Sequence, residues 1–406
     1  MSWSAFGVLF DPDEGADSIQ KKINDLIKGT RPVNPYRAVL GSEEVKGLNI
    51  KDCGEVPIES WLSIYPVEDD LVLLNTTNYG TFLDSDGCRE YKDRVRDYAK
   101  DLERTLMIGG DHSLTGGVIE SLMEKYEDIY LIVFDSHFDG IPSPIRNGLI
   151  GYMMETRPDY ERFGYKPSDY VFSSTGRKNS YNGGSFIYHL INEGIIDAEN
   201  ILVFGPLDYP TEKMERIQDI RVREFVQVYK GLEKEGVKIV HRGIIDSFGI
   251  DEATNVFISQ KSMSRSVYVS VDLDIGSRSA LMGAKFTDIE GLKEADIYKA
   301  LWTLQRNTKK IIGLDLMEID PWRAGALIDG IKDRTYNICG NVIRMLTEGK
   351  ICLDRKYKEV IEKISRKSTL KELGEKKVLN DLVKMGFVTF SGKYVSALYN
   401  GEILPL

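Results

Sequence analysis

The sequence predicts an α/β fold, a doubly wound parallel sheet, followed by a small winged-helix-like module. Two observations predict the sheet. Short continuous apolar runs, typical of strands buried on both faces, recur along residues 1–350. Segments with helical patterns separate these runs, which indicates successive βα units. A third observation sets residues 354–406 apart, because they carry 11 Lys and Arg against 7 Asp and Glu and break the alternation.

The apolar runs and the amphipathic segments define the expected elements in chain order. We expect strands over residues 6–10, 106–108, 129–134, 201–204, 266–271 and 310–314. We expect helices over residues 17–27, 85–103, 114–126, 184–193, 211–235, 293–306 and 331–348. Residues 140–182 are rich in Pro, Gly, Ser, Tyr and Arg and show little periodicity. We therefore predict a long loop or insertion there, which in a compact domain is usually functional or mobile.

The sequence pattern of the final segment, residues 354–406, predicts three helices followed by a hairpin through residues 387–395. Its lysines have two possible roles. They could contact phosphates, or they could simply form the solvated face of a lid or oligomerisation module, which we favour. The lysines concerned are Lys376, Lys377, Lys384 and Lys393.

The composition of the chain argues against several classes of function. The chain has 406 residues, 42% of them hydrophobic, and a formal net charge of −10. This is typical of a soluble globular protein and argues against a nucleic-acid-binding surface over the whole molecule. The cysteines are scattered and form no CxxC pair, so we expect neither a zinc knuckle nor a disulfide framework. We predict a cytoplasmic protein, because no signal peptide or membrane span is evident. The four cysteines are Cys53, Cys88, Cys339 and Cys352.

Four polar clusters follow predicted strands. They are Gly109–Ser113, Asp135–Asp139, Ser270–Asp274 and Asp315–Pro321. Ligands of open α/β sheets bind beyond the carboxyl ends of the strands, so all four clusters should converge on one crevice. Each cluster alone is weak evidence, since a lone DxD is often solvated and GGDHS can be a helix-capping turn.

Strand geometry adds support for a metal site. If the backbone stays extended, Asp135, His137 and Asp139 share one face, and Asp272 and Asp274 share another. Carboxylates packed this closely repel one another unless a cation lies between them. Carboxylate with imidazole suits Mn²⁺, although Fe, Co, Ni and Zn remain possible.

In this order, the motifs resemble those of the ureohydrolase superfamily, which includes arginases, agmatinases and formimidoylglutamases. The resemblance extends over roughly residues 5–348 and rests on GGDHS, D-x-H-x-D, S-x-D-x-D and a glutamate before a proline. Asp52–Val56 and the passage 193–205 also match family segments. The resemblance implies a three-layer arginase/deacetylase-like fold and an agmatinase-like, metal-dependent amidinohydrolase. It would release urea or an equivalent amide from a small cationic guanidino or amidino substrate.

The resemblance also implies roles for individual residues. One metal would be held by His112, Asp135, Asp139 and Asp272. The second would be held by Asp135, His137, Asp272 and Asp274, so that Asp135 and Asp272 bridge. A hydroxide shared by the two ions would attack the substrate carbon. Asp139 or Asp274 would carry its proton to the departing amine, and Glu318 would pair with the substrate cation.

The chain departs from the family pattern at the substrate side. The family's second histidine motif aligns with Asn182–Ser185, so Gly183 replaces the histidine. After Asp274 the expected Asp-Pro is absent, and Pro210 stands where arginases carry an acidic residue, which favours agmatine over arginine. We expect the substrate pocket to be lined by Gly183, Gly184, Ser185 and Tyr181. The candidates to replace the histidine are Tyr181, Lys178, Arg177 and His189, although His189 is expected to pack.

We further expect the insertion, residues 140–182, to lie over the crevice, since it begins directly after Asp139. Its wall would be built from Tyr152, Tyr165, Tyr170 and Tyr181. Two other functions compete with the leading one. A single-zinc deacetylase-like enzyme is disfavoured by the complete six-ligand set. A catalytically altered protein with a binding or regulatory role is favoured by the missing histidine. In either case we expect a homo-oligomer without a membrane or nucleic-acid partner.

Overall fold

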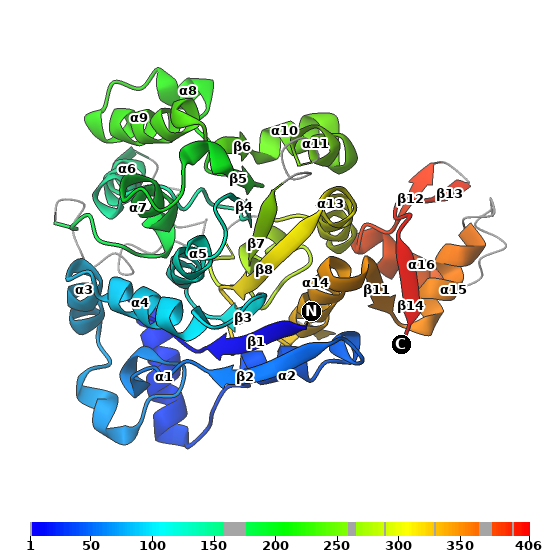
Figure 1. Cartoon of the computed structure of the whole chain (residues 1–406), viewed down its shortest axis with the longest axis horizontal. Helices are drawn as coiled ribbons and strands as arrows, with labels where there is room; N and C mark the ends of the chain where they lie inside the picture. Colours follow the sequence, from blue (N-terminus) through cyan, green and yellow to red (C-terminus); the bar gives the residue numbers. More distant parts are fainter. Residues whose placement is uncertain are drawn as a thin grey trace.

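The computed structural model describes residues 2–156, 176–258, 265–287, 290–328, 330–364, 376–391 and 394–406. The centre of the described part is an eight-stranded parallel sheet with the strand order β2-β1-β3-β8-β7-β4-β5-β6 (Figure 1). The strands are β1 (Trp3–Val8), β2 (Ile50–Glu55), β3 (Thr105–Gly109), β4 (Ile129–Phe134), β5 (Ile201–Phe204), β6 (Lys238–Val240), β7 (Ser266–Asp272) and β8 (Lys310–Met317). The predicted doubly wound parallel sheet is confirmed.

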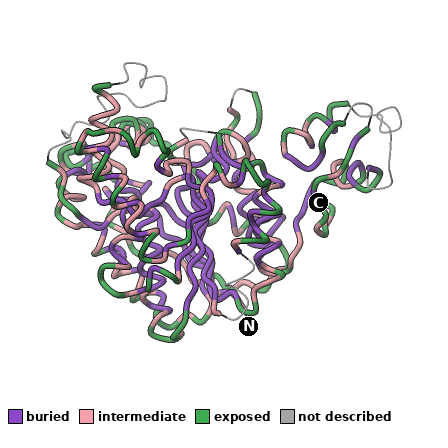
Figure 2. The backbone as a smooth tube through the Cα atoms, turned by 90° about the horizontal axis from the view of Figure 1, so that it is seen from above, coloured by how far each residue is buried: buried purple, intermediate pink, exposed green. Residues whose placement is uncertain are grey.

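Helices cover both faces of this sheet, because its strands are apolar on both sides. In β4, Leu131 and Val133 join one buried cluster, and Tyr130, Ile132 and Phe134 join the other. The cluster of Leu131 contains side chains from α1 (Ala16–Lys28), α4 (Gly87–Ala99), α5 (Thr115–Met123), α7 (Phe186–Asn192) and α9 (Ile220–Glu235). Buried backbone therefore follows the sheet through the middle of the molecule, with exposed segments outside it (Figure 2).

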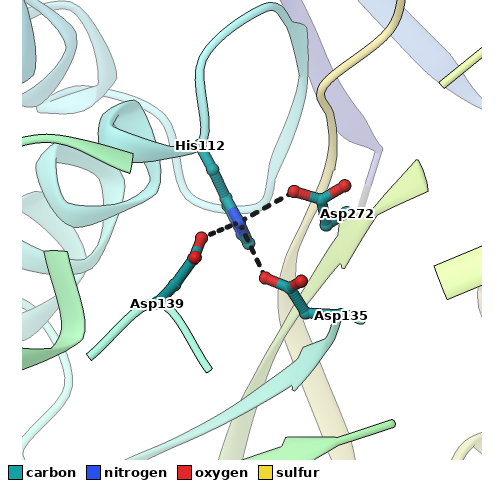
Figure 3. A group of neighbouring side chains, drawn as sticks. All are labelled: His112, Asp135, Asp139 and Asp272. Carbon is teal, nitrogen blue, oxygen red and sulfur yellow. Dashed lines mark hydrogen bonds and ion pairs between the residues drawn. The ribbon is translucent and has the colours of Figure 1, made fainter. Parts of the chain in front are cut away.

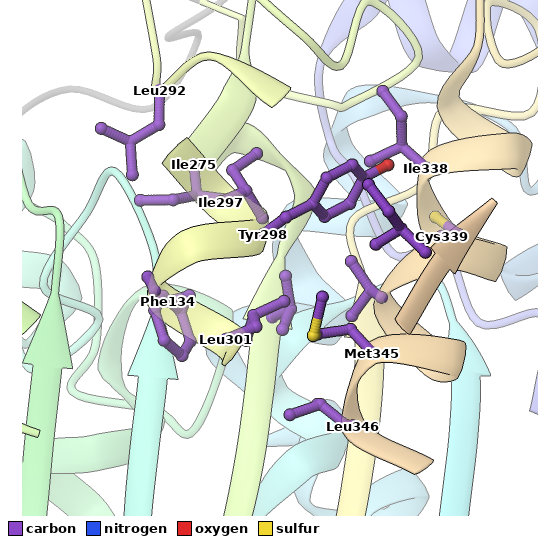
Figure 4. Packing of buried hydrophobic residues seen from close by; sticks show 14 of the residues in the cluster. Phe134, Ile275, Leu292, Ile297, Tyr298, Leu301, Ile338, Cys339, Met345 and Leu346 are labelled. Carbon is purple, nitrogen blue, oxygen red and sulfur yellow. The ribbon is translucent and has the colours of Figure 1, made fainter. Parts of the chain in front are cut away.

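The opposite face packs against a second group of helices. They are α2 (Pro35–Leu40), α10 (Arg242–Phe248), α11 (Ile250–Phe257), α13 (Glu294–Asn307) and α14 (Thr335–Glu348). Figure 4 shows Tyr298 and Leu301 of α13 near Cys339 and Met345 of α14. Dense apolar packing of this kind fixes the helices relative to the sheet and holds the strand ends in place.

Several elements differ from the sequence prediction. The helix expected over 211–235 is two helices, α8 (Glu212–Glu215) and α9, because the Asp219 carboxylate accepts from Arg221 N at 2.9 Å and caps a new start. The segment expected to be a loop after Asp139 contains α6 (Ser143–Thr156), whose low amphipathicity concealed it. Residues 157–175 lie outside the described part. The prediction also missed α2, α3 (Thr76–Asp84), α10 and α11, as well as strands β2 and β6.

The final segment packs against the main sheet's helices. Strand β11 (Lys350–Leu353) pairs in parallel with β14 (Glu402–Pro405), and between them lie α15 (Arg355–Ile364), α16 (Lys376–Lys384) and the hairpin of β12 (Val388–Ser391) and β13 (Tyr394–Ala397). Phe387 contacts Tyr298 of α13, with 6.2 Å between ring centroids. Ala295 N donates to Met385 O at 2.9 Å. The boundary expected near residue 350 stays a prediction.

None of the helices that the structure describes combines the length and the apolar character needed to cross a membrane.

Candidate metal centre

The four polar clusters meet because their strands are neighbours. β3, β8, β7 and β4 are consecutive in the sheet, and all run in the same direction. Their carboxyl ends therefore lie along one edge, and the residues that follow them face a common space. The register pairs Phe134 with Val271, which places Asp135 beside Asp272.

The first group of side chains surrounds one imidazole nitrogen (Figure 3). His112 Nδ1 lies 3.0 Å from Asp139 Oδ2, 3.2 Å from Asp272 Oδ2 and 3.3 Å from Asp135 Oδ2. All four residues are buried, and one ligand atom of each lies within 4.8 Å of the others. These are the four residues that the sequence assigned to one metal, so the structure brings that set together.

The second group shares Asp135 with the first. It consists of Asp135, His137 and Asp274, and His137 Nδ1 lies 2.6 Å from Asp274 Oδ2. His137 Nδ1 is 3.8 Å from Asp135 Oδ1, and the His137 side chain is 24% exposed, so this group is open toward solvent. Asp272, which was expected to bridge both metals, belongs only to the first group by this geometry. Its bridging role stays a prediction.

Local turns, rather than an extended strand, direct these carboxylates. Asp135 Oδ1 accepts from His137 N at 2.6 Å, and Asp272 Oδ1 accepts from Asp274 N at 2.9 Å. Asp274 lies in a 3-10 helix, Leu273–Gly276, and Asp139 has a φ of 52°. The backbone is therefore not extended here, which was the condition under which alternating residues were expected to share one face. The turns send His137 and Asp274 to the second group, whereas Asp135 belongs to both groups.

A buried hydrogen-bond chain orients the first imidazole. His112 Nε2 lies 2.8 Å from Ser270 Oγ, which donates to Asp315 Oδ1 at 2.6 Å. Asp315 Oδ2 also accepts from Tyr268 Oη at 2.7 Å and from Thr115 Oγ1 at 2.8 Å. With Nε2 protonated and donating to Ser270, the Nδ1 lone pair faces the carboxylates. This support was not predicted from the sequence, although an aspartate at the end of an apolar strand was a visible signal.

The electrostatics of the cluster call for a cation. Burial, together with Asp139, Asp274 and Asp272, raises the pKa of Asp135 well above its usual range. Burial and Asp274 raise the pKa of Asp272 to about 7. Asp135 Oδ2 and Asp274 Oδ2 are buried and accept no hydrogen bond from any residue the structure describes. Buried carboxylate oxygens without a hydrogen-bond partner, beside imidazole nitrogens, fit a pair of divalent cations such as Mn²⁺.

Glu318 is fixed to the turn that carries His112. Its Oε1 accepts from His112 N at 2.7 Å, and its own N donates to Gly110 O at 2.6 Å. Its φ of 59° is unfavourable for a residue with a side chain, and such strain concentrates at functional sites. The other oxygen, Oε2, lies 3.5 Å from Lys285 Nζ.

The two glycines at the missing histidine face charged groups. A Cβ at Gly183 would lie 3.6 Å from the Asp111 carboxylate oxygens, and one at Gly184 would lie 3.2 to 3.4 Å from the guanidinium of Arg146. The Arg146 side chain comes from α6, lies 3.7 Å from Asp139 Oδ1 and donates to Gly184 O at 3.2 Å. Arg146 therefore fills space beside Gly184 at the cluster. This role of Arg146 was not predicted from the sequence.

The described ends of the insertion are joined beside Asp139. Ile141 N donates to Gly184 O at 3.1 Å, and Ile187 N donates to Asp139 O at 3.1 Å. These bonds and Arg146 bring the first residues of the insertion to the cluster. That the insertion as a whole covers the crevice stays a prediction. Tyr152 lies instead near Arg221, 5.5 Å from its guanidinium, and Tyr165 and Tyr170 lie outside the described residues.

Other residues expected at the pocket have partners elsewhere. The Tyr181 side chain is 1% exposed, and its hydroxyl donates to Ser113 O, while Ser185 Oγ donates to Ser180 O. Arg177 pairs with Glu14 at 2.7 Å, and Lys178 is exposed. His189 packs against Tyr181 and Tyr188, as expected. Both hydroxyls are therefore engaged by the backbone, and the two glycines stay the predicted substrate contacts.

One further acid faces the second group. Asp208, in the loop after β5, is partly buried, and this burial raises its pKa, while the charges of Arg146 and His137 lower it. Its oxygens accept from Tyr229 Oη at 3.0 Å and from Phe138 N at 3.4 Å. Asp208 thereby links the loop after β5 to His137 and Arg146.

Comparison with known proteins agrees with this geometry. The arginase family model matches residues 11–328. Putative agmatinase 1 of Schizosaccharomyces pombe is 24% identical over 315 residues, 72% of this chain and 64% of that protein. An arginase of Staphylococcus aureus (strain MRSA252) is 23% identical over 53% of this chain and 60% of its own length. The chain thus spans less than two thirds of both relatives. The arginase structure from Bacillus caldovelox has a TM-score of 0.52 at 17% identity, covering 86% of this chain and 98% of that chain.

Proposed function

This chain belongs to the arginase family, and from that we propose that it is a metal-dependent hydrolase that cleaves a C–N bond of a small linear guanidino or amidino compound. The observation that carries the proposal is the pair of overlapping side-chain groups joined by Asp135. The relatives named agmatinase and arginase support this bond type. The products would be urea, or an equivalent amide, and an amine.

The chain offers ligands for two divalent ions, and Mn²⁺ fits their chemistry. His112, Asp135, Asp139 and Asp272 would hold one ion. Asp135, His137 and Asp274 would hold the other, with Asp272 as the further ligand that the motif predicts. When bound, such ions lower the pKa of water and so supply a nucleophile near neutral pH.

Asp139 is better placed than Asp274 to move a proton. Asp274 Oδ1 accepts from Ser136 N at 2.8 Å, and its Oδ2 lies 2.6 Å from His137 Nδ1 inside the second group. Asp139 directs only Oδ2 to His112, and its side chain is 9% exposed against 1% for Asp274. We assign Asp139 as the group that takes the proton of the attacking water and gives it to the departing amine.

Arg146 and Asp208 would complete the site on the side where the family histidine is missing. Arginine stays protonated at all physiological pH values, so Arg146 cannot shuttle protons. Its charge instead orients Asp139 at 3.7 Å and favours an electron-rich atom of the substrate beside Gly184.

A hydrolysis assay tests this function. The full-length protein with added Mn²⁺ would be incubated with a panel of guanidino, amidino and ureido compounds, and released urea or ammonia would be measured. We expect turnover of at least one compound and its loss in Asp139→Asn. Metal-loaded protein that hydrolyses no member of the panel would instead support the second candidate, a family member with a binding role. That candidate is favoured by Gly183, which offers no side chain to the substrate.

A further inference from the structure

Two buried cations and two buried anions lie side by side at the Glu318 edge of the metal centre. We call them the buried quartet: Asp11, Lys22, Lys285 and Glu318. Lys285 Nζ lies 2.7 Å from Asp11 Oδ1 and 3.5 Å from Glu318 Oε2. Lys22 Nζ lies 3.2 Å from Asp11 Oδ2. The side chains of Lys285 and Glu318 are only 9% and 4% exposed.

The four charges of the quartet balance one another without any ligand, and the negative charges of Asp13 and Asp111 also act on Lys285. Lys22 and Asp11 are fully buried and pair with each other, and Lys22 Nζ also donates to Asp11 O at 2.5 Å. Because Lys22 already balances Asp11, the charge of Lys285 is left to balance Glu318. The carboxylate that the proposed function reserves for a substrate cation thus already has a cation from its own chain.

The backbone fixes Lys285 in this position. Lys285 N donates to Glu318 O at 2.9 Å, and Ala284 forms an antiparallel bridge with Ile319. A Cβ at Gly283 would approach Ala324 to 2.4 Å, so the strand-like segment lies tightly against its neighbour. The backbone therefore holds Lys285 beside Glu318.

We propose that Lys285 is a specificity-determining residue, and that the substrate is uncharged at the group that meets Glu318. This inference rests on the proposed function and narrows its substrate class. A guanidinium entering beside Lys285 adds a second buried positive charge, which is unfavourable in a poorly solvated pocket. A planar neutral group, such as an acylated guanidine or amidine, keeps the hydrogen bonds and avoids the repulsion. Agmatine, the substrate expected from the sequence, is disfavoured.

Two probes of equal shape isolate the charge. Butylguanidinium and butylurea present the same planar group and chain, but only the first is a cation at neutral pH. Their dissociation constants would be measured by calorimetry on the full-length protein with Mn²⁺, at one pH and ionic strength. The proteins are wild type, Lys285→Met, and Asp11→Asn with Lys285→Met, which keeps the buried charges balanced. Lys309→Met is the control. Lys309 is exposed and precedes the amino end of β8, whereas Glu318 follows the carboxyl end of this strand.

We expect the wild type to prefer butylurea. The ratio of the dissociation constants, butylguanidinium over butylurea, should fall by at least about tenfold in both Lys285 variants and stay unchanged in Lys309→Met. The proposal is overturned if the ratio in the balanced double variant equals that of the wild type. It is also overturned if neither probe binds to any of the proteins. Since binding is measured without turnover, a failed hydrolysis panel would count against the proposed function alone.

Discussion

Asp135 and Asp272 make the same turn at the ends of neighbouring parallel strands. In each, Oδ1 accepts the backbone N–H of the residue two positions ahead, at 2.6 Å for His137 and 2.9 Å for Asp274, and Oδ2 faces His112 Nδ1. This turn consumes one carboxylate oxygen and leaves the other for a cation. It also sends the i+2 side chain into the second group. The repeated sequence pattern D-x-H and D-x-D is thus explained by one local geometry.

Because Asp135 belongs to both groups, its replacement should affect both ions. We predict that Asp135→Asn binds neither Mn²⁺ ion tightly, whereas Asp272→Asn loses at least one. Metal content per chain, measured by elemental analysis after gel filtration, checks this. Asp128→Asn, at the turn before β4, is a matched control that should keep the wild-type content. Full metal content in Asp135→Asn would contradict the assignment of the shared ligand.

The chain from His112 through Ser270 to Asp315 should govern metal affinity without touching the metal. We predict that Ser270→Ala and Asp315→Asn each weaken Mn²⁺ binding by about 10- to 100-fold, because the imidazole loses the partner that holds its tautomer and orientation. Ser266→Ala, at the amino end of the same strand, should leave the affinity unchanged. Competition with a metal-sensitive dye measures these affinities. Equal affinities in Ser270→Ala and Ser266→Ala would show that the chain has no such role.

The sequence could predict the strands and ligands because their signals are local. Ile129–Phe134 is apolar throughout and therefore recognisable as a doubly buried strand, and the structure places β4 at these residues. The motif order then identified which strand ends carry ligands. What local signals could not reveal is pairing across distant segments. Lys285 and Asp11 are 274 positions apart, and Arg146 and Gly184 meet across 38 positions, next to the hydrogen bond from Ile141 N to Gly184 O.

Helix α6 is a second element that local sequence signals could not predict. Its residues include Pro144, Gly148 and Gly151, which lower helix propensity, so residues 143–156 were expected to be a loop. Packing against α9 stabilises the helix, together with Arg221, which pairs with Glu155 at 2.8 Å. Tertiary contact overrides propensity here, and the consequence for the site is the position of Arg146.

Arg146 should affect turnover more than metal binding. We predict that Arg146→Ala lowers kcat/KM by about 10- to 100-fold, as expected for a lost charge-assisted contact, with unchanged Mn²⁺ content. Arg146→Lys should recover part of this loss, since it keeps the charge but not the planar donor geometry. Arg216→Ala, at an exposed position in the loop before α9, is the control. Loss of metal together with activity would show that Arg146 merely stabilises the cluster.

The final segment should stabilise the protein without contributing to the metal centre. Phe387 is fully buried between Tyr298 of α13 and Tyr399, whereas Phe390 on β12 is 41% exposed. We predict that Phe387→Ala lowers the free energy of unfolding by about 3 to 5 kcal/mol through cavity formation. Phe390→Ala should change it by no more than about 0.5 kcal/mol.

Both proteins, purified folded at low temperature, should keep the wild-type Mn²⁺ content, because all residues of the two candidate groups lie between His112 and Asp274. Denaturant unfolding measures the first quantity and elemental analysis the second. If folded Phe387→Ala lost its metal, the final segment would have to help shape the strand ends as well as cover α13.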